Sequence, residues 1–188
     1  MVKSGKKWAL KGKSGILGLK KTAKTTLMPQ LLGEFTCKID NKGRVRLPAP
    51  LLKQLGDAAL QGFVLNRGFE QCLTLYPKEA WSKISDELSK LNLYVKKNRA
   101  FVRYFFRGAT ELELDKNTRL LLPKTLLNYA AVEQQVIFFA YFDRIEIWSK
   151  EVYETLLEEE PMNFGDLAEE VMGQFNTDLG DGRGIELS

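Results

Sequence analysis

Two short basic segments hold the residues whose types and spacing could do chemistry. Residues 40–48 have the sequence DNKGRVRLP, and residues 115–123 have the sequence DKNTRLLLP. An arginine can hold a guanine edge through two hydrogen bonds, and lysines neutralise backbone phosphates. The predicted chemistry is therefore recognition of a polyanion such as double-stranded DNA, without bond making or breaking. The candidate contact residues are Arg44, Lys42, Arg46, Lys38, Arg119 and Lys116.

The same segments contain the residues that we expect to form their turns: Asp40, Gly43, Asp115 and Asn117. An aspartate carboxylate can bond nearby backbone amides and glycine accepts a positive φ, so each segment is predicted to be a tight reversal between strands. Thr118 occupies the position that Gly43 has in the first segment. Because a β-branched residue tolerates positive φ poorly, we expect the second turn to be built differently or to place Asn117 in the left-handed region.

Several of these residues also have a purely structural interpretation. An Asx-type bond explains both aspartates without any ligand, and we favour that interpretation for them. For Arg44 the alternative to a DNA contact is an ion pair with an aspartate or with a neighbouring subunit. The residues alone do not separate these two alternatives.

The basic segments belong to two related halves of the chain. The second segment follows the first at an offset of 75 positions, and Leu51 and Leu52 match Leu126 and Leu127 at the same offset. Residues 73–76 then match residues 145–148 after a contraction of three residues. Because each half has too little core to stand alone, we expect the two to bury their apolar faces against each other.

The apolar patterning predicts an α+β protein in which each half is a β-α-β-β unit. Alternation of apolar and polar residues predicts a strand at 34–40, in which Phe35, Cys37 and Ile39 face inward. The first half should continue with a strand at 44–47, a helix at 50–55 and strands at 63–65 and 72–76. The second half should contain strands at 112–114 and 120–122, a helix at 124–129 and strands at 136–139 and 144–148.

Two helical stretches are predicted between the halves. In the first, Trp81, Ile84, Leu88 and Leu91 recur at helical spacing, and the second runs over residues 95–107. The second mixes basic and aromatic residues, which could bind single-stranded nucleic acid by stacking. We favour the alternative that the aromatic residues face a core while the basic heads extend into solvent. After Trp148, residues 151–160 are predicted to be helical, and the chain from Gly173 onward to be a mobile acidic tail.

Charge is distributed unevenly along the chain. Residues 1–30 hold eight lysines and no acid, and residues 151–188 hold eleven acids against Arg183 alone. The overall charge of +4 therefore leaves +6 on residues 31–150. A cationic centre favours a polyanionic partner. Residues 1–30 are predicted to form a disordered basic arm.

Composition argues against several classes of function. With no histidine, and with Cys37 and Cys72 far apart, neither a metal site nor a disulfide framework is predicted, and a reducing cytoplasm fits best. The apolar runs are shorter than the roughly 20 residues that cross a bilayer. No nucleophile elbow is present, and Lys7 stands where a phosphate loop needs its first glycine. We therefore expect no enzyme activity, no cofactor, no small-molecule substrate and no membrane partner.

The chain resembles the MraZ family in its first basic segment, which Gly33-Glu34-Phe35 precedes. The resemblance continues through residues 105–109, 113–115 and 120–123, ends at residues 143–148, and covers roughly residues 31–155. It implies two tandem AbrB-like swapped-hairpin domains that form a pseudo-dimeric double-split β-barrel and assemble into a ring. It also implies a cytoplasmic, nucleoid-associated transcriptional regulator that binds repeats in promoters of cell-division and cell-wall genes. Arg44 and Arg119 occupy the arginine position of the family motif, and Arg44 is therefore the first candidate for a direct DNA contact.

The resemblance also suggests a division of the chain. We expect a basic arm at 1–30, a first unit at 31–78, a helical connector at 79–107, a second unit at 108–152 and an acidic helix and tail at 153–188. Family members begin close to Gln30, so Met28 is a candidate start and residues 1–27 need not be native. Because the first turn is the more basic, we expect the first unit to dominate DNA binding. The alternative function is an antitoxin-like or other protein-interaction module that uses the acidic C-terminal segment.

Overall fold

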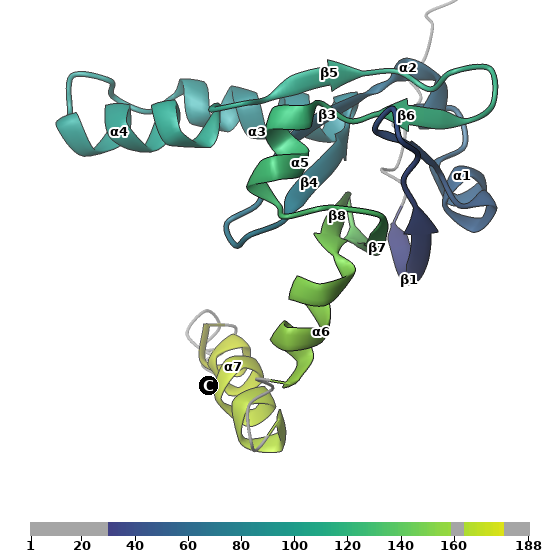
Figure 1. Ribbon diagram of the computed structural model, residues 1–188. Coiled ribbons are helices and arrows are strands. Elements are labelled where there is room, and N and C mark those ends of the chain that lie inside the picture. Colours follow the sequence, from purple (N-terminus) through teal and green to yellow (C-terminus); the bar gives the residue numbers. More distant parts are fainter. Residues whose placement is uncertain (1–29, 159–163, 179–188) are drawn as a thin grey trace, which may run out of the picture.

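The computed structural model describes residues 30–158 and 164–178. It is an α+β structure, as the sequence predicts, built on a six-stranded antiparallel sheet and a two-stranded ribbon (Figure 1). The expected basic arm, with residues 1–29, lies outside the described residues. The strands are β1 (Leu31–Lys38), β2 (Arg44–Arg46), β3 (Phe63–Arg67), β4 (Leu73–Pro77), β5 (Thr110–Leu112), β6 (Arg119–Leu121), β7 (Gln135–Phe142) and β8 (Arg144–Ser149). The helices are α1 (Ala49–Leu55), α2 (Ala58–Gln61), α3 (Lys78–Ser89), α4 (Lys96–Phe105), α5 (Lys124–Tyr129), α6 (Lys150–Glu158) and α7 (Phe164–Asp178).

The leading strand of each half pairs with the other half. The order in the large sheet is β1-β7-β8-β4-β3-β5, so β1 extends the β7–β8 hairpin and β5 extends the β3–β4 hairpin. The ribbon joins β2 to β6, one strand from each half. Each half is therefore β-β-α-β-β, with an additional α2 in the first, rather than the expected β-α-β-β. The reason is that the turn at Asp40 separates two strands with different partners.

A pseudo-two-fold axis relates the two halves. In the ribbon, Val45 lies opposite Leu120, its own counterpart in the repeat. In the large sheet, Thr74 lies opposite Glu146, which is again its counterpart. In an antiparallel pair, a residue that faces its own equivalent lies on the symmetry axis. The axis therefore passes through the β2–β6 ribbon and through the β4–β8 pair.

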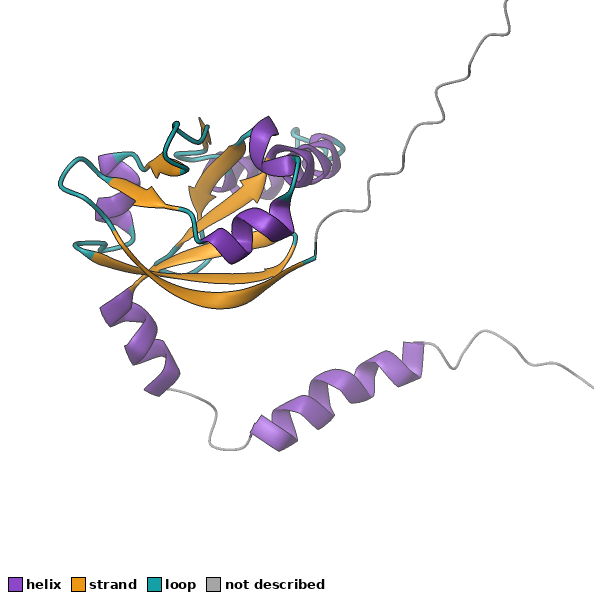
Figure 2. Ribbon diagram, turned by 90° about the vertical axis from the view of Figure 1, so that its right-hand side faces the viewer, coloured by secondary structure: helices purple, strands orange, loops and turns teal. Residues whose placement is uncertain are grey.

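The main core lies between the large sheet and the ribbon. Val45 and Leu120 of the ribbon are both fully buried, as are Phe63 and Phe138 of the sheet. Apolar residues from α1 and α5 complete the same cluster. Figure 2 shows the long strands of the sheet below the shorter strands, with α6 leading away from the opposite side. This packing leaves the outer face of the ribbon directed toward solvent.

Helices cover part of the outer face of the large sheet. Trp81 of α3 packs against Tyr76 with 5.6 Å between ring centroids, and Tyr153 of α6 packs against Trp148 at 6.0 Å. The Tyr153 hydroxyl donates a hydrogen bond of 2.8 Å to the Glu34 carboxylate, which ties α6 to β1. Across residues 30–158 and 164–178, no helix has the length and apolar character that crossing a bilayer requires.

The C-terminal helix α7 corrects a prediction. The chain from Gly173 onward was expected to be a mobile tail, but α7 continues to Asp178. Phe164, Leu167 and Val171 supply the spacing of an amphipathic helix, and a single glycine within it costs only about 1 kcal/mol relative to alanine. The part of the expected tail that follows residue 178 lies outside the described residues.

Replacing Leu120, which lies at the pseudo-symmetry axis, should destabilise the folded protein. We expect Leu120→Ala to lower the free energy of unfolding by about 2–5 kcal/mol, because the side chain is fully buried and the core cannot collapse onto the gap. The adjacent Leu121 is 58% exposed, so Leu121→Ala should change the free energy of unfolding by less than about 0.5 kcal/mol. Urea denaturation of the two variants measures the difference. Equal effects would contradict the placement of the ribbon over the core.

Candidate nucleic-acid interface

The first basic turn is organised by the carboxylate of Asp40. Its Oδ1 accepts hydrogen bonds from the backbone amides of Lys42 at 2.9 Å and Arg44 at 3.0 Å. Its Oδ2 accepts a hydrogen bond of 2.8 Å from the Nε of Arg44 and lies 2.7 Å from Nη2 of the same side chain. Gly43 adopts φ +79°, and its amide donates to the Asp40 carbonyl at 2.8 Å. One aspartate thus fixes both the backbone reversal and the direction of the arginine.

The second turn has the same geometry. Asp115 Oδ1 accepts hydrogen bonds from the backbone amides of Asn117 at 2.8 Å and Arg119 at 3.0 Å. Its Oδ2 accepts a hydrogen bond of 2.8 Å from the Nε of Arg119 and lies 2.7 Å from Nη2. The expectation that this turn would differ, or place Asn117 in the left-handed region, is wrong. Thr118 itself takes φ +57°, and its hydroxyl donates to the Asn117 carbonyl at 2.7 Å. The hydrogen bonds around Asp115 outweigh the unfavourable backbone conformation of a β-branched residue.

The two turns are also bonded to each other's strands. The Leu122 amide donates to the Gly43 carbonyl at 2.9 Å, and the Leu47 amide donates to the Thr118 carbonyl at 3.0 Å. A Cβ at Gly43 would lie 3.1 Å from the Leu122 carbonyl oxygen, so this close approach favours glycine. The ribbon and its turns therefore form one rigid element that spans both halves.

The outer face of the ribbon gathers three arginines and a leucine. Arg44 lies opposite Leu121, and Arg46 lies opposite Arg119. Directly opposed Cβ atoms in an antiparallel pair are about 4.5–5.5 Å apart, so Arg46 and Arg119 place two cations side by side. Asp115 partly neutralises Arg119. Among the residues that the structure describes, Arg46 is exposed and has no acidic partner within ion-pair distance.

The other candidate residues fall into two groups. The side chains of Arg44 and Arg119 are 30% and 26% exposed and bound to their aspartates, so the Arg–Asp pair considered as an alternative is the observed arrangement. Lys42 and Lys116 are exposed at the turn tips, and neither takes part in an ion pair between described residues. The structure thus separates two clamped arginines from a set of exposed cations.

Lys38 and Arg46 line one open groove of about 620 Å³. The groove runs between β1 and the segment that leads from β2 into α1, and it also includes Thr36 and Pro48. The sequence gives no signal for this proximity, because it depends on how β1 curves past the ribbon. The groove brings Lys38 near Arg46, and the acidic Glu34 also lines it.

The clamping arginines lower the pKa of both turn carboxyls. The side-chain hydrogen bond from Arg44 is the main reason why the pKa of Asp40 is lowered from 3.8 to about 2, and backbone amides add to it. The side-chain hydrogen bond from Arg119 likewise lowers the pKa of Asp115 to about 2. Both carboxylates are therefore charged at neutral pH.

Within the described ranges, no group of three or more cysteine, aspartate or glutamate side chains is arranged to hold a metal ion.

Comparison with known proteins identifies the family. The family model described as "MraZ protein, putative antitoxin-like" matches the chain twice, over residues 30–104 and 105–175. The chain belongs to the MraZ family. This result confirms the resemblance inferred from the two basic turns, and the tandem match agrees with two related halves.

Relatives from several bacteria are named "Transcriptional regulator MraZ". The protein of Flavobacterium psychrophilum is 43% identical over 152 residues, which are 80% of this chain and 97% of the relative. The protein of Christiangramia forsetii is 42% identical, over 80% of this chain and 98% of the relative. That of Caldanaerobacter subterraneus subsp. tengcongensis is 41% identical, over 74% and 94%. MraZ-family membership therefore makes the chain a member of a family of transcriptional regulators, which are not enzymes.

Relief of the strain at Thr118 should stabilise the protein. We expect Thr118→Gly to raise the free energy of unfolding by about 1 kcal/mol, because glycine adopts a positive φ without penalty. The reverse change at the equivalent position, Gly43→Thr, should be destabilising because its Cβ would approach the Leu122 carbonyl. Thermal unfolding measures both, and the expected rise for Thr118→Gly is about 2–4 °C. A fall in unfolding temperature for Thr118→Gly would contradict the strain at this position.

Acid should remove the stabilisation of the folded protein that the Asp–Arg clamps provide. The pKa of Asp40 is lower in the folded protein than the ordinary value of 3.8, so its stabilising effect is complete above about pH 4 and is lost as the pH falls toward 2. We expect the wild-type advantage over Asp40→Asn to be nearly constant above about pH 4, to fall as the pH passes through 2, and to vanish below it. Denaturant unfolding at a series of pH values checks this, and Asp115→Asn is the matched twin. A difference that does not depend on pH would exclude the clamp as a source of stability.

Proposed function

We propose that this protein is a sequence-specific DNA-binding transcriptional regulator that contacts DNA through the β2–β6 ribbon and its two turns. The observation that carries the proposal is a group of exposed cations that form no ion pair between described residues: Lys42, Arg46 and Lys116 on the ribbon and its turns, and Lys38 at the end of the neighbouring β1. We further propose that the sheet and ribbon together form the double-split β-barrel of two AbrB-like swapped-hairpin units. Strand exchange between the halves supports this arrangement.

The ribbon has a suitable shape for a DNA groove. A two-stranded antiparallel ribbon fits the major groove, where side chains on its outer face reach base edges. Arg46 points to that side, opposite Arg119, and two adjacent cations repel each other until an anion lies between them. Bound DNA would therefore relieve an unfavourable contact as well as add new ones.

The observed clamps alter the proposed role of Arg44. Its Nε and Nη2 are bound to Asp40, so we assign it a positioning role, in which it fixes the turn that displays Lys42 and the strand that displays Arg46. Arg46 then takes the direct base contact that the sequence suggested for Arg44. Arg119 has the corresponding positioning role beside Lys116.

The two halves of the chain contribute unequal charge to the ribbon and its surroundings. The repeat places Leu121 at the position of Arg46, and Glu113 at the position of Lys38. The first half therefore supplies most of the DNA contacts in this proposal. A single contact of this kind discriminates by roughly 1–3 kcal/mol, which is too little for a gene-specific switch. We propose a ring of protomers that engages repeats in the promoters of cell-division and cell-wall genes, so that weak contacts add up to useful avidity.

This proposal places the protein in the cytoplasm, at the nucleoid. Its alternative is an antitoxin-like protein-interaction module, which the matching family description also names. The acidic helices α6 and α7 are the candidate segment, since α7 exposes apolar side chains. Pull-down after removal of residues 164–188 separates the two functions: a protein partner held by α7 would be lost, whereas the ribbon and the Tyr153 contact of α6 are kept.

DNA titrations test the proposed contacts. Genomic fragments selected by the wild-type protein supply the specific site, and a scrambled duplex supplies the control. We expect Arg46→Ala to lose about 1–3 kcal/mol of discrimination between them. Lys42→Ala should weaken binding to both and lower the logarithmic salt slope by about 0.9.

Lys96→Ala is the matched control, because Lys96 is exposed and, like Lys42, forms no ion pair between described residues, but it lies on α4, away from the ribbon. It should bind both duplexes like the wild type. If Arg46→Ala and Lys42→Ala also bind with wild-type affinity, the ribbon is not the DNA-binding element.

A further inference from the structure

A polar pocket of about 280 Å³ lies at the base of the first basic turn. Its lining residues are Lys38, Ile39, Asn41, Gln134 and Gln135. Lys38 also lines the groove that contains Arg46, so the pocket and the groove meet at this one side chain. Pockets for whole small molecules hold roughly 300–1,000 Å³, so this one suits a single chemical group. It is called the amide pocket below.

Strand exchange between the halves builds the amide pocket. β1 of the first half pairs with β7 of the second half, which places Lys38 directly opposite Gln135. The Ile39 amide donates a hydrogen bond of 2.9 Å to the Gln134 carbonyl. The second half therefore supplies two glutamines to the first turn, which the sequence alone does not bring together.

The side chains of the amide pocket offer donors that the protein itself does not use. Asn41 and Gln134 are exposed, and Gln135 is half-buried. Between the residues that the structure describes, none of these three side-chain amides forms a hydrogen bond. Each carboxamide has two N–H donors, and the Lys38 ammonium has three. Asparagine, glutamine and lysine side chains all bind phosphate oxygens in protein–DNA complexes, so this set of donors matches a phosphate group.

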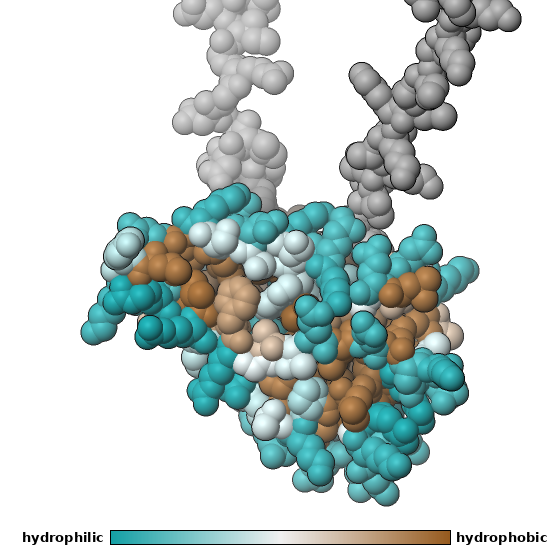
Figure 3. Space-filling view, turned by 90° about the horizontal axis from the view of Figure 1, so that it is seen from above, coloured by the Kyte–Doolittle hydropathy of each residue, from teal (hydrophilic) through white to brown (hydrophobic). Residues whose placement is uncertain are grey.

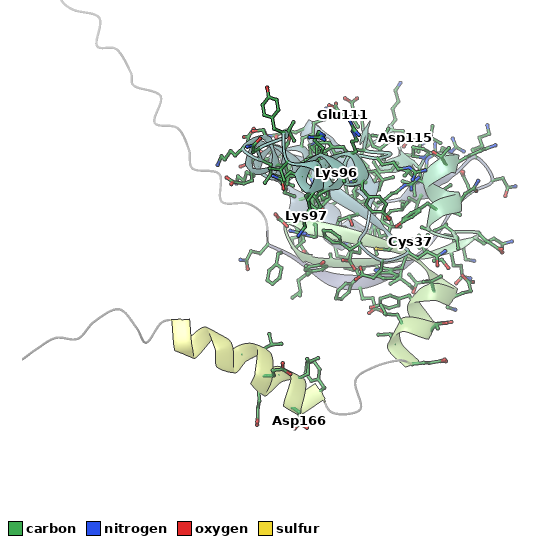
Figure 4. The ribbon with its side chains drawn as sticks, turned by 90° about the vertical axis from the view of Figure 1, so that its left-hand side faces the viewer. Cys37, Lys96, Lys97, Glu111, Asp115 and Asp166 are labelled. Carbon is green, nitrogen blue, oxygen red and sulfur yellow. The ribbon has the colours of Figure 1, made fainter. Side chains whose placement is uncertain are left out.

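The surroundings of the amide pocket are open to a large partner. Figure 3, which looks onto the side that carries the ribbon, shows hydrophilic side chains along much of the rim at the end opposite α4. Figure 4 shows Cys37, the neighbour of Lys38 in β1, apart from Asp115 of the second turn and from Lys96 of α4. The exposed Glu133 precedes Gln134 but does not line the pocket.

We propose that the amide pocket holds a phosphate group of the DNA backbone while the ribbon contacts the bases. Asn41, Gln134 and Gln135 would donate to the phosphate oxygens, and Lys38 would supply the positive charge. The inference deepens the proposed function, because it rests on DNA binding by the ribbon and names a backbone contact that the second half makes at the first turn. A phosphate held in this pocket fixes the register of the duplex against Arg46.

The corresponding place at the second turn lacks this set of donors. Glu113 occupies the position of Lys38 in the repeat. Gly62 lies beside it, and a Cβ at Gly62 would be 3.4 Å from the Cγ of Glu113. A carboxylate repels phosphate, and glycine has no side-chain donor. The proposed phosphate contact therefore belongs to the first turn and adds to the inequality between the halves.

Uncharged phosphates in the duplex test the contact with the full-length chain. The selected duplex is prepared as a series in which methylphosphonate replaces one phosphate at a time. Wild-type binding should weaken about tenfold at the phosphate that the pocket holds, because hydrogen bonds to a charged group are lost. The double variant Gln134→Ala, Gln135→Ala should bind the unmodified duplex about tenfold more weakly and lose nothing further at that phosphate. At all other phosphates the two proteins should respond alike.

Gln134→Lys gives a second readout, in which binding becomes stronger. It should tighten binding to the specific and the scrambled duplex alike and raise the logarithmic salt slope by about 0.9, because it adds a cation beside a phosphate. Gln71→Lys is the matched control, since Gln71 is exposed but lies between β3 and β4, away from the ribbon. It should leave the slope unchanged.

Two results would overturn the phosphate contact. One is the same methylphosphonate profile for the wild type and the double variant, and the other is an equal salt slope for Gln134→Lys and Gln71→Lys. Circular dichroism checks that all variants are folded. If only this contact fails, Arg46→Ala and Lys42→Ala still weaken DNA binding, whereas a wild-type chain that binds no duplex overturns both proposals. The two failures are therefore distinguishable.

Discussion

The pairing of β2 with β6 is the constraint on which the rest of the structure depends. It joins the two halves at equivalent residues, closes the core over Val45 and Leu120, and turns the remaining side chains of both strands outward. The two β-turns bond to each other's strands, so a shift in one half would break contacts in the other. The cations on this ribbon therefore have a fixed spacing without help from any partner.

The Asp–Arg clamps illustrate how one pair of residues can be structural and still serve recognition. A carboxylate that accepts two amides and a guanidinium makes a short turn rigid without burying it. The clamp binds Arg44, the arginine of the motif, to Asp40. The nearby cations Lys42 and Arg46 stay exposed on the turn and strand that the clamp holds in place. The same logic explains why the second turn keeps its shape with Thr118 in the glycine position.

Local sequence patterns predicted much of the secondary structure but few of the long-range contacts. Alternation in β1 and helical spacing in α3 depend on neighbouring residues, so the sequence predicted these elements and the α+β class. The exchange of β1 and β5 between halves involves residues more than 40 positions apart, and only the family resemblance implied it. The shared groove of Lys38 and Arg46 depends on strand curvature and had no sequence signal. Helix α7 was missed because its acidic composition concealed the apolar spacing of Phe164, Leu167 and Val171.

Fusion of the two halves into one chain has an evolutionary consequence. Two separate copies of a short unit would place identical residues at both ends of the ribbon, and every substitution would appear twice across the axis. Joined by α3 and α4, the halves can mutate independently while Val45 and Leu120 preserve their common centre. Arg46 and Leu121 record such a divergence: the duplicated scaffold has retained its symmetry in the interior and lost it on the surface.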